Sequence, residues 1–126
     1  MTKRTAESSN ELGRQSEPSF LILTSLASGD KHGYALAKDV EAFSGVTLGP
    51  GTLYGAISRL EERGLIAPVP SDDRRQPYQI TASGRTALAS AVRDMRALAD
   101  EGSRRLRLSV LTLRHALRPD FTELAQ

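Results

Sequence analysis

The 126-residue sequence contains no cysteine and no tryptophan, and aromatic residues make up only 5% of it. Without cysteine the chain cannot form a disulfide framework, a catalytic thiolate or a cysteine-ligated metal site. No apolar run approaches the roughly 18 residues that cross a bilayer. No apolar segment follows the basic residues near the N-terminus either, so we expect a cytoplasmic protein with no secretory signal and no membrane partner.

Signals for catalysis are equally scarce. The sequence has two histidines, His32 and His115, and neither has a carboxylate or serine at the spacing of a known catalytic motif. Gly49-Pro50-Gly51 lacks the Lys-Ser/Thr pair of a phosphate-binding loop. We therefore expect that the protein is not an enzyme, that it has no catalytic residue, and that it binds no metal and no cofactor.

The net charge is only +2, but it is unevenly distributed. Residues 1–63 carry 7 basic and 8 acidic side chains, whereas residues 64–118 carry 10 basic and 5 acidic ones. The positive charge is therefore concentrated in the second half of the chain, and its position there favours an anionic partner.

Three short helices are expected behind a polar arm at residues 1–17, which has too little apolar surface to fold. Their ranges are about 18–27, from 31–33 to 43, and 50–63. Proline opens the first and the third. The first helix is apolar on several sides and belongs at the centre of the core. In the second, Leu36, Val40 and Phe43 have the i, i+4, i+7 spacing of a buried stripe.

The third helix has two contrasting faces. Its expected core stripe consists of Leu53, Ala56, Ile57 and Leu60. The opposite face is small, polar and nearly free of acid; it consists of Gly51, Thr52, Tyr54, Gly55, Ser58 and Arg59. Such a face allows close approach to the DNA major groove, which admits one α-helix. Pairing of Arg59 with a neighbouring glutamate, or packing of Tyr54 on Tyr34, remains open.

Tyr34 and Lys38 are predicted on the outer face of the second helix, where that helix would cross the DNA backbone. The alternative is that Tyr34 packs on a neighbouring loop or on a partner subunit.

A β-hairpin is expected after the third helix, with strands near 65–69 and 78–80. Pro68 and Pro77 should limit it to edge pairing. Arg74 and Arg75 lie near the tip, where they would reach a minor groove or a phosphate. The alternative is a solvated turn neutralised by two neighbouring aspartates.

A long amphipathic helix is expected over 82–118, followed by a tail at 119–126. Its apolar residues alternate steps of three and four, as in a helix–helix seam. The dimerisation residues we expect are Leu88, Val92, Met95, Leu98, Leu106, Val110 and Leu113. Gly102-Ser103 leaves open a kink or a split in this helix.

The expected fold class is mainly α with a small β-hairpin. The order of the elements predicts a winged helix-turn-helix over 18–81, followed by a long C-terminal dimerisation helix. Four segments carry a specific resemblance to the PadR family of bacterial transcription regulators. They are His-Gly-Tyr-Ala-Leu-Ala at 32–37, Gly-Pro-Gly-Thr-Leu-Tyr at 49–54, Arg-Leu-Glu-Glu-Arg-Gly-Leu-Ile at 59–66, and Tyr-Gln-Ile-Thr-Ala-Ser-Gly-Arg at 78–85. The resemblance covers about residues 18–100.

The resemblance implies a homodimeric cytoplasmic repressor whose third helix reads a pseudo-palindromic double-stranded DNA operator. It also implies release from DNA by a small aromatic or cationic effector. Candidate lining for an effector cavity between the long helices is Phe20, Leu88, Val92 and Met95. Two alternatives stay open: a winged-helix protein–protein module without DNA binding, and a small-molecule sensor with its cavity at the dimer interface.

The chain departs from the family pattern at three points. Gly55 stands where many members have proline, and the wing reads Asp-Asp-Arg-Arg-Gln-Pro instead of a Gly-Arg-Pro run. The absence of tryptophan also excludes effector stacking on that residue.

Overall fold

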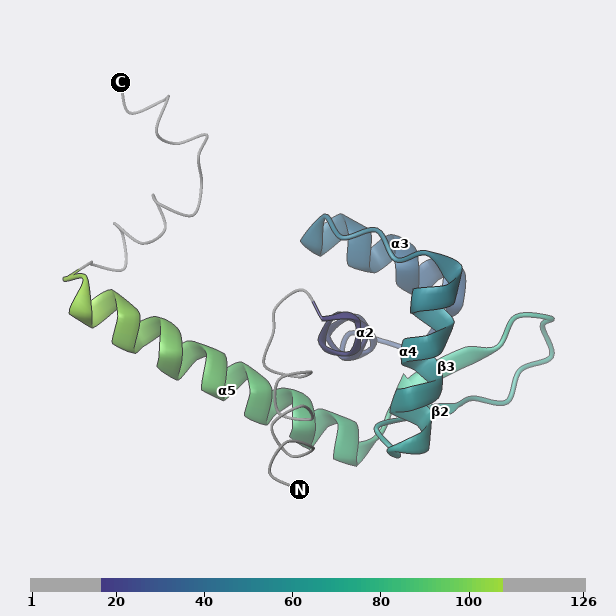
Figure 1. Ribbon diagram of the computed structural model, residues 1–126. Helices are drawn as coiled ribbons and strands as arrows, with labels where there is room; N and C mark the ends of the chain where they lie inside the picture. Colours follow the sequence, from purple (N-terminus) through teal and green to yellow (C-terminus); the bar gives the residue numbers. More distant parts are fainter. Residues whose placement is uncertain (1–16, 108–126) are drawn as a thin grey trace. The chain divides into compact units, whose positions relative to one another are not determined.

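A computed structural model of the chain describes residues 17–107 (Figure 1). The elements are α2 (Pro18–Leu26), β1 (Lys31–His32), α3 (Gly33–Ser44), α4 (Pro50–Glu62), β2 (Ile66–Pro68), β3 (Pro77–Ile80) and α5 (Ala82–Arg105). This mainly helical fold with a small antiparallel sheet confirms the predicted winged helix-turn-helix. The first compact unit runs to Val92 and a second begins at Arg93, within α5.

The core of the first unit is built around α2, which packs against α3, α4 and β3. Figure 1 shows α2 end-on, beside α3 and α4. Ile22, Leu23 and Leu26 are completely buried, and burial of each such side chain contributes roughly 1.5–3 kcal/mol. The helix that the sequence shows as apolar on several sides is therefore central, as predicted.

A polar cluster fastens the turn after α2. The Ser25 hydroxyl donates to Asp39 Oδ2 at 2.6 Å. The Lys31 ammonium donates to the carbonyl of Ser25 at 2.6 Å and lies 3.8 Å from Asp39. These contacts tie α2, β1 and α3 together and satisfy backbone carbonyls at the end of α2.

The sheet has three strands in the order β1-β3-β2, where the sequence predicted a two-stranded hairpin. The predicted hairpin is present as β2 and β3, and the strand that the prediction missed is β1, whose Lys31 and His32 pair with Tyr78 and Pro77. β3 is therefore the central strand, and the expected restriction to edge pairing does not hold for it. Pro77 is tolerated because it is the first residue of its strand.

In the helix-turn-helix, formed by α3 and α4, α3 ends at the predicted glycine and α4 buries its predicted core stripe. Gly45 ends α3 with a φ of 77°, a left-handed conformation that glycine adopts without strain. All four residues of the predicted α4 core stripe are buried; they are Leu53, Ala56, Ile57 and Leu60. The placement of Phe43 in the core was wrong, since its side chain is 47% exposed. Leu48, which follows the turn, packs in the core instead.

The start of α5 is fixed by Thr81. Its hydroxyl accepts a hydrogen bond from the Gly84 N–H at 3.0 Å and donates to the Gly64 carbonyl at 2.6 Å. Gly84 is buried at a point where a Cβ would overlap the Leu65 carbonyl oxygen. Leu88 packs against the core of the first unit. The first turns of α5 are therefore part of the winged domain.

The far end of α5 differs from the expected helix. It continues through Gly102 and ends at Arg105, and Arg107 has a φ of 59°. Leu106, which the sequence analysis placed in the same helix over 82–118, lies in the turn that follows α5. The expected N-terminal arm (apart from its last residue), the remainder of the expected helix at 108–118 and the tail lie outside the described residues. No helix within 17–107 combines the length and apolar character needed to span a membrane.

Candidate nucleic-acid interface

The outer face of α4 has the character that the sequence predicts. The residues of this face are Gly51, Thr52, Tyr54, Gly55, Ser58 and Arg59. All of them are exposed except Gly55, which is half-buried. No acidic residue lies in the first turn. Within residues 17–107, no ion pair joins Arg59 to Glu61 or Glu62. The guanidinium lies beside Gly55, 3.6 Å from the position a Cβ would take there, and is available to an anion.

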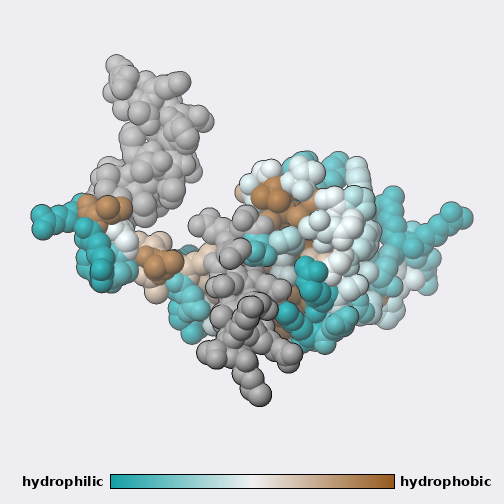
Figure 2. Space-filling view, viewed as in Figure 1, coloured by the Kyte–Doolittle hydropathy of each residue, from teal (hydrophilic) through white to brown (hydrophobic). Residues whose placement is uncertain are grey.

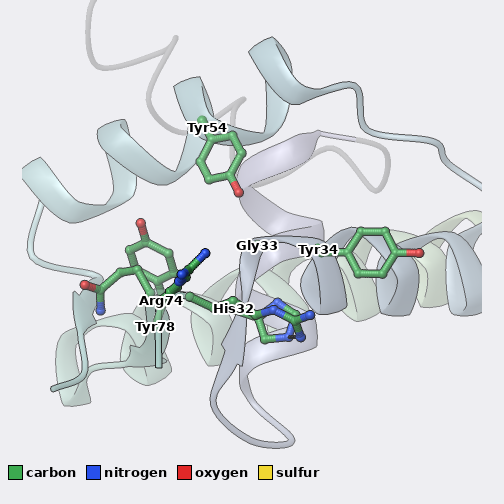
Figure 3. A pocket seen from close by; sticks show the side chains of 8 residues that line it. His32, Gly33, Tyr34, Tyr54, Arg74 and Tyr78 are labelled. Atoms are coloured by element: carbon green, nitrogen blue, oxygen red, sulfur yellow. Dashed lines mark hydrogen bonds between the residues drawn. The ribbon is translucent and has the colours of Figure 1, made fainter. Parts of the chain in front are cut away.

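Tyr34 and Lys38 are neighbours on the exposed side of α3. The Lys38 ammonium lies 5.4 Å from the centre of the Tyr34 ring, within the range of a cation–π contact. Tyr34 is 66% exposed, so it does not pack on a loop of the described chain. Figure 3 shows its hydroxyl pointing away from Tyr54. Contact of these two residues with a phosphate remains a prediction.

Tyr54 lies against Gly33 and not against Tyr34. A Cβ on Gly33 would overlap the Tyr54 hydroxyl and stand 2.9 Å from its Cζ. Figure 3 shows the Tyr54 hydroxyl directed from α4 toward the start of α3. Glycine at position 33 therefore provides the space in which the phenol lies.

The loop between β2 and β3, residues 69–76, is the wing; it projects from the sheet as a hydrophilic extension (Figures 1 and 2). Asp73 accepts the backbone N–H of Arg74 at 2.7 Å. Across residues 17–107, no ion pair links either wing arginine to Asp72 or Asp73. The Gln76 amide donates to the carbonyls of Val69 and Pro77 at 3.0 and 2.8 Å, which fixes the base of the wing.

Arg75 reaches back across the sheet to His32. Its Nη1 lies 3.2 Å from Nε2 of the imidazole. The other ring nitrogen, Nδ1, caps α3 by accepting the Ala35 N–H at 3.3 Å. The wing is therefore linked to the start of α3 through one histidine.

These side chains surround an open hollow of about 260 Å³. Its lining consists of His32, Gly33, Tyr34, Tyr54, Arg74, Arg75, Gln76 and Tyr78. Burial raises the pKa of the Tyr78 phenol, and the charges of Glu61 and Tyr54 raise it further. Tyr78 therefore remains a protonated donor at neutral pH.

Four lining residues were absent from the predicted site: His32, Gly33, Gln76 and Tyr78. The β1–β3 pairing brings His32 opposite Pro77, and no helical or strand periodicity reveals that pairing. The His-Gly-Tyr segment at the start of α3 was the available signal.

The predicted dimerisation residues have different environments. Leu98 and Leu106 are 75% and 71% exposed, Val92 and Met95 are half-buried, and Leu88 contacts the winged domain. Val110 and Leu113 lie outside the described residues. Phe20, predicted to line an effector cavity, is buried at 8% exposure. Dimerisation and effector binding remain predictions.

Comparison with known sequences gives matches over the winged domain. The profile described as "Transcriptional regulator PadR-like family" matches residues 22–90. A curated relative, the "Uncharacterized 37.1 kDa protein in transposon TN4556" of Streptomyces fradiae, is 40% identical over 82 residues, which are 65% of this chain. The chain spans 24% of that relative's length.

Solved structures similar to this chain also include PadR family regulators. A PadR family transcription regulator from Clostridium difficile R20291 is 29% identical, with a TM-score of 0.64 over 71% of this chain and 97% of that one. A PadR family transcriptional regulator from Eggerthella lenta is 25% identical, with a TM-score of 0.61 over 86% of this chain and 93% of that one.

Proposed function

This chain belongs to the Transcriptional regulator PadR-like family, and from that premise we propose that it is a cytoplasmic, dimeric DNA-binding repressor released by a small molecule. The observation that supports DNA binding most strongly is the combination of an acid-poor α4 face with a wing whose guanidinium groups form no ion pair within residues 17–107. The family supplies the regulatory role.

We propose that α4 enters the major groove, with Thr52, Ser58 and Arg59 facing base edges and phosphates. Side chains of these types donate and accept at base edges and bind phosphate oxygens. Tyr34 and Lys38 on α3, and Arg74 and Arg75 on the wing, then lie on elements flanking α4, and Tyr54 lies on α4 itself beside the hollow. Phosphate contacts on both sides would fix its orientation in the groove.

We further propose that a second copy covers the apolar side of α5. Leu98 is 75% exposed on α5, and burial of an exposed leucine contributes roughly 1.5–3 kcal/mol. Glu101 pairs with Arg104 and, at 2.7 Å, with Arg105, so these charges belong to the solvated flank. A two-fold dimer predicts half-sites about 10 base pairs, or a multiple of that, apart.

Release by an effector is the remaining part of the proposal. The family resemblance supports a small aromatic or cationic compound, and a thermal-shift screen of such compounds tests it. A compound that raises the melting temperature should also weaken operator binding; a flat response throughout would remove this part of the proposal.

The experiment that tests DNA binding is a gel-shift assay against the DNA upstream of the protein's own gene, with unrelated DNA as competitor. We expect a saturable, sequence-selective complex at low salt. Arg74→Glu combined with Arg75→Glu should abolish that complex while leaving the dimer intact. A protein–protein module would instead show no selective complex, and this variant would retain its protein partner.

A further inference from the structure

We propose that the hollow between α3, α4 and the wing holds one phosphate group of the DNA backbone, with His32 and Arg75 donating to it together. The inference rests on the DNA-binding function proposed above. It adds His32 to the residues that contact DNA and gives Arg75 a partner in the complex that differs from its partner in the free protein.

The chemistry of the lining selects an oxyanion. Arg74 and Arg75 carry the formal charges at the hollow, and no carboxylate is among its lining residues. The hydroxyls of Tyr54 and Tyr78 add two donors, since a phenol keeps its proton at neutral pH. Guanidinium and phenol groups all donate to phosphate oxygens.

The His32–Arg75 contact supplies a second, independent argument. A neutral imidazole has one donor nitrogen and one acceptor nitrogen. Because Nδ1 accepts the Ala35 N–H, Nε2 carries the hydrogen and faces the Arg75 Nη1 donor at 3.2 Å. In the other tautomer Nε2 accepts from Arg75, but Nδ1–H then faces the Ala35 N–H.

Neither tautomer therefore satisfies both contacts of His32. A phosphate oxygen beside Nε2 and Nη1 would accept from both, and Nδ1 would keep the α3 cap. An anion at this point removes the donor–donor conflict that exists without it.

The openness of the hollow favours a phosphate of a polymer over a free small molecule. Sites for small ligands bury about 70–90% of the ligand surface, whereas Arg74, Arg75 and Gln76 at the rim are all exposed. A backbone phosphate needs only its two non-ester oxygens inside and keeps its sugars in the solvent. The volume of about 260 Å³ also leaves room for several waters at about 30 Å³ each.

Two variants separate this contact from the stability of the fold. His32→Asn keeps an acceptor for the Ala35 N–H, because asparagine is among the best N-cap residues, but it removes Nε2. Arg75→Gln removes the charge from the wing. Arg93→Gln, on α5, is the matched control because it removes the same charge from an exposed position.

The experiment measures binding of the full-length protein to operator fragments that each carry one neutral methylphosphonate in place of a phosphate. We expect His32→Asn and Arg75→Gln each to weaken binding to unmodified DNA about tenfold, with melting temperatures near that of the wild type. Arg75→Gln should also reduce the salt slope by about 0.9. At one phosphate position per half-site, methylphosphonate should weaken the wild type clearly more than it weakens either variant, because each variant has already lost one donor to that phosphate.

Two outcomes would overturn the proposed phosphate site, and a third would refute the proposed function on which it rests. Variants that lose the same factor on every fragment would show a structural role for His32 and overturn the proposal. Competition by inorganic phosphate, beyond that of chloride at equal ionic strength and without coupling to any methylphosphonate, would assign the hollow to a free anion and also overturn it. A wild-type protein that binds no operator would instead refute the proposed function itself.

Discussion

Gly33→Ala should weaken DNA binding while leaving the fold nearly as stable as before. The added Cβ would stand 2.9 Å from Tyr54 Cζ and 3.1 Å from Cε1, and would overlap the hydroxyl. Tyr54 is 51% exposed, so its ring can rotate into solvent instead of forcing the backbone apart.

Two opposing effects determine the change in unfolding free energy caused by Gly33→Ala. A displaced or strained tyrosine rotamer costs about 0.5–1.5 kcal/mol, and alanine is favoured over glycine in a helix by roughly 0.5–1 kcal/mol. The net change in unfolding free energy should therefore remain within about 1 kcal/mol. Loss of a hydroxyl contact with a charged phosphate costs about 1.5–3 kcal/mol, which predicts operator binding at least about tenfold weaker.

Fluorescence anisotropy with labelled operator DNA measures the affinity, and thermal unfolding measures the stability. Gly102→Ala is the matched control, because nothing lies within 4 Å of the new Cβ in that helix and DNA affinity should not change. In a Tyr54→Phe background the effect of Gly33→Ala on affinity should become much smaller, since the two changes remove one interaction. Full affinity for Gly33→Ala alongside weak binding by Tyr54→Phe would refute the claim that Tyr54 binds DNA from its position against Gly33.

Three further predictions concern packing, assembly and pH. Gly84→Ala should cost roughly 1–3 kcal/mol in chemical denaturation, because its Cβ would overlap the Leu65 carbonyl oxygen; stability equal to that of wild type would show that α5 does not approach Leu65 so closely. Leu98→Glu, at a 75% exposed position, should give a folded monomer in sedimentation with weakened operator binding, and a persistent dimer would remove Leu98 from the interface. Because burial raises the pKa of Tyr78, the folded state holds that proton more tightly than the unfolded chain. Stability should therefore decline as pH rises above about 10, and the slope should be shallower in Tyr78→Phe; an identical slope in both proteins would contradict this assignment.

The helical part of the fold could be predicted because each helix carries local signals that agree with its packing. Proline at the first turn of α2 and α4, glycine after α3, and the period of the α4 core stripe all depend on residues near one another in sequence. Phe43 fitted the same period but is exposed, because the chain turns at Gly45 and Leu48 enters the core. Periodicity alone does not specify where a helix leaves the core.

The parts that could not be predicted depend on contacts between distant residues. β1 has two residues and no alternating pattern, and it exists only because β3 offers it an unpaired edge. That pairing brings His32 to Arg75, 43 residues away, and completes the hollow. The predicted DNA-facing residues of α4 and the wing were recognisable from local composition, whereas the residues between them were not.

The measurement that tests the central claim most directly is the salt dependence of wild-type binding to its selected operator and to a scrambled fragment of equal length. A dimer that neutralises six or more phosphates should lose roughly a thousandfold in operator affinity between about 50 and 200 mM salt. It should also prefer the operator over the scrambled fragment by at least about a thousandfold. Equal affinity for the two fragments, or binding insensitive to salt, would contradict the assignment of this chain as a sequence-specific DNA-binding regulator.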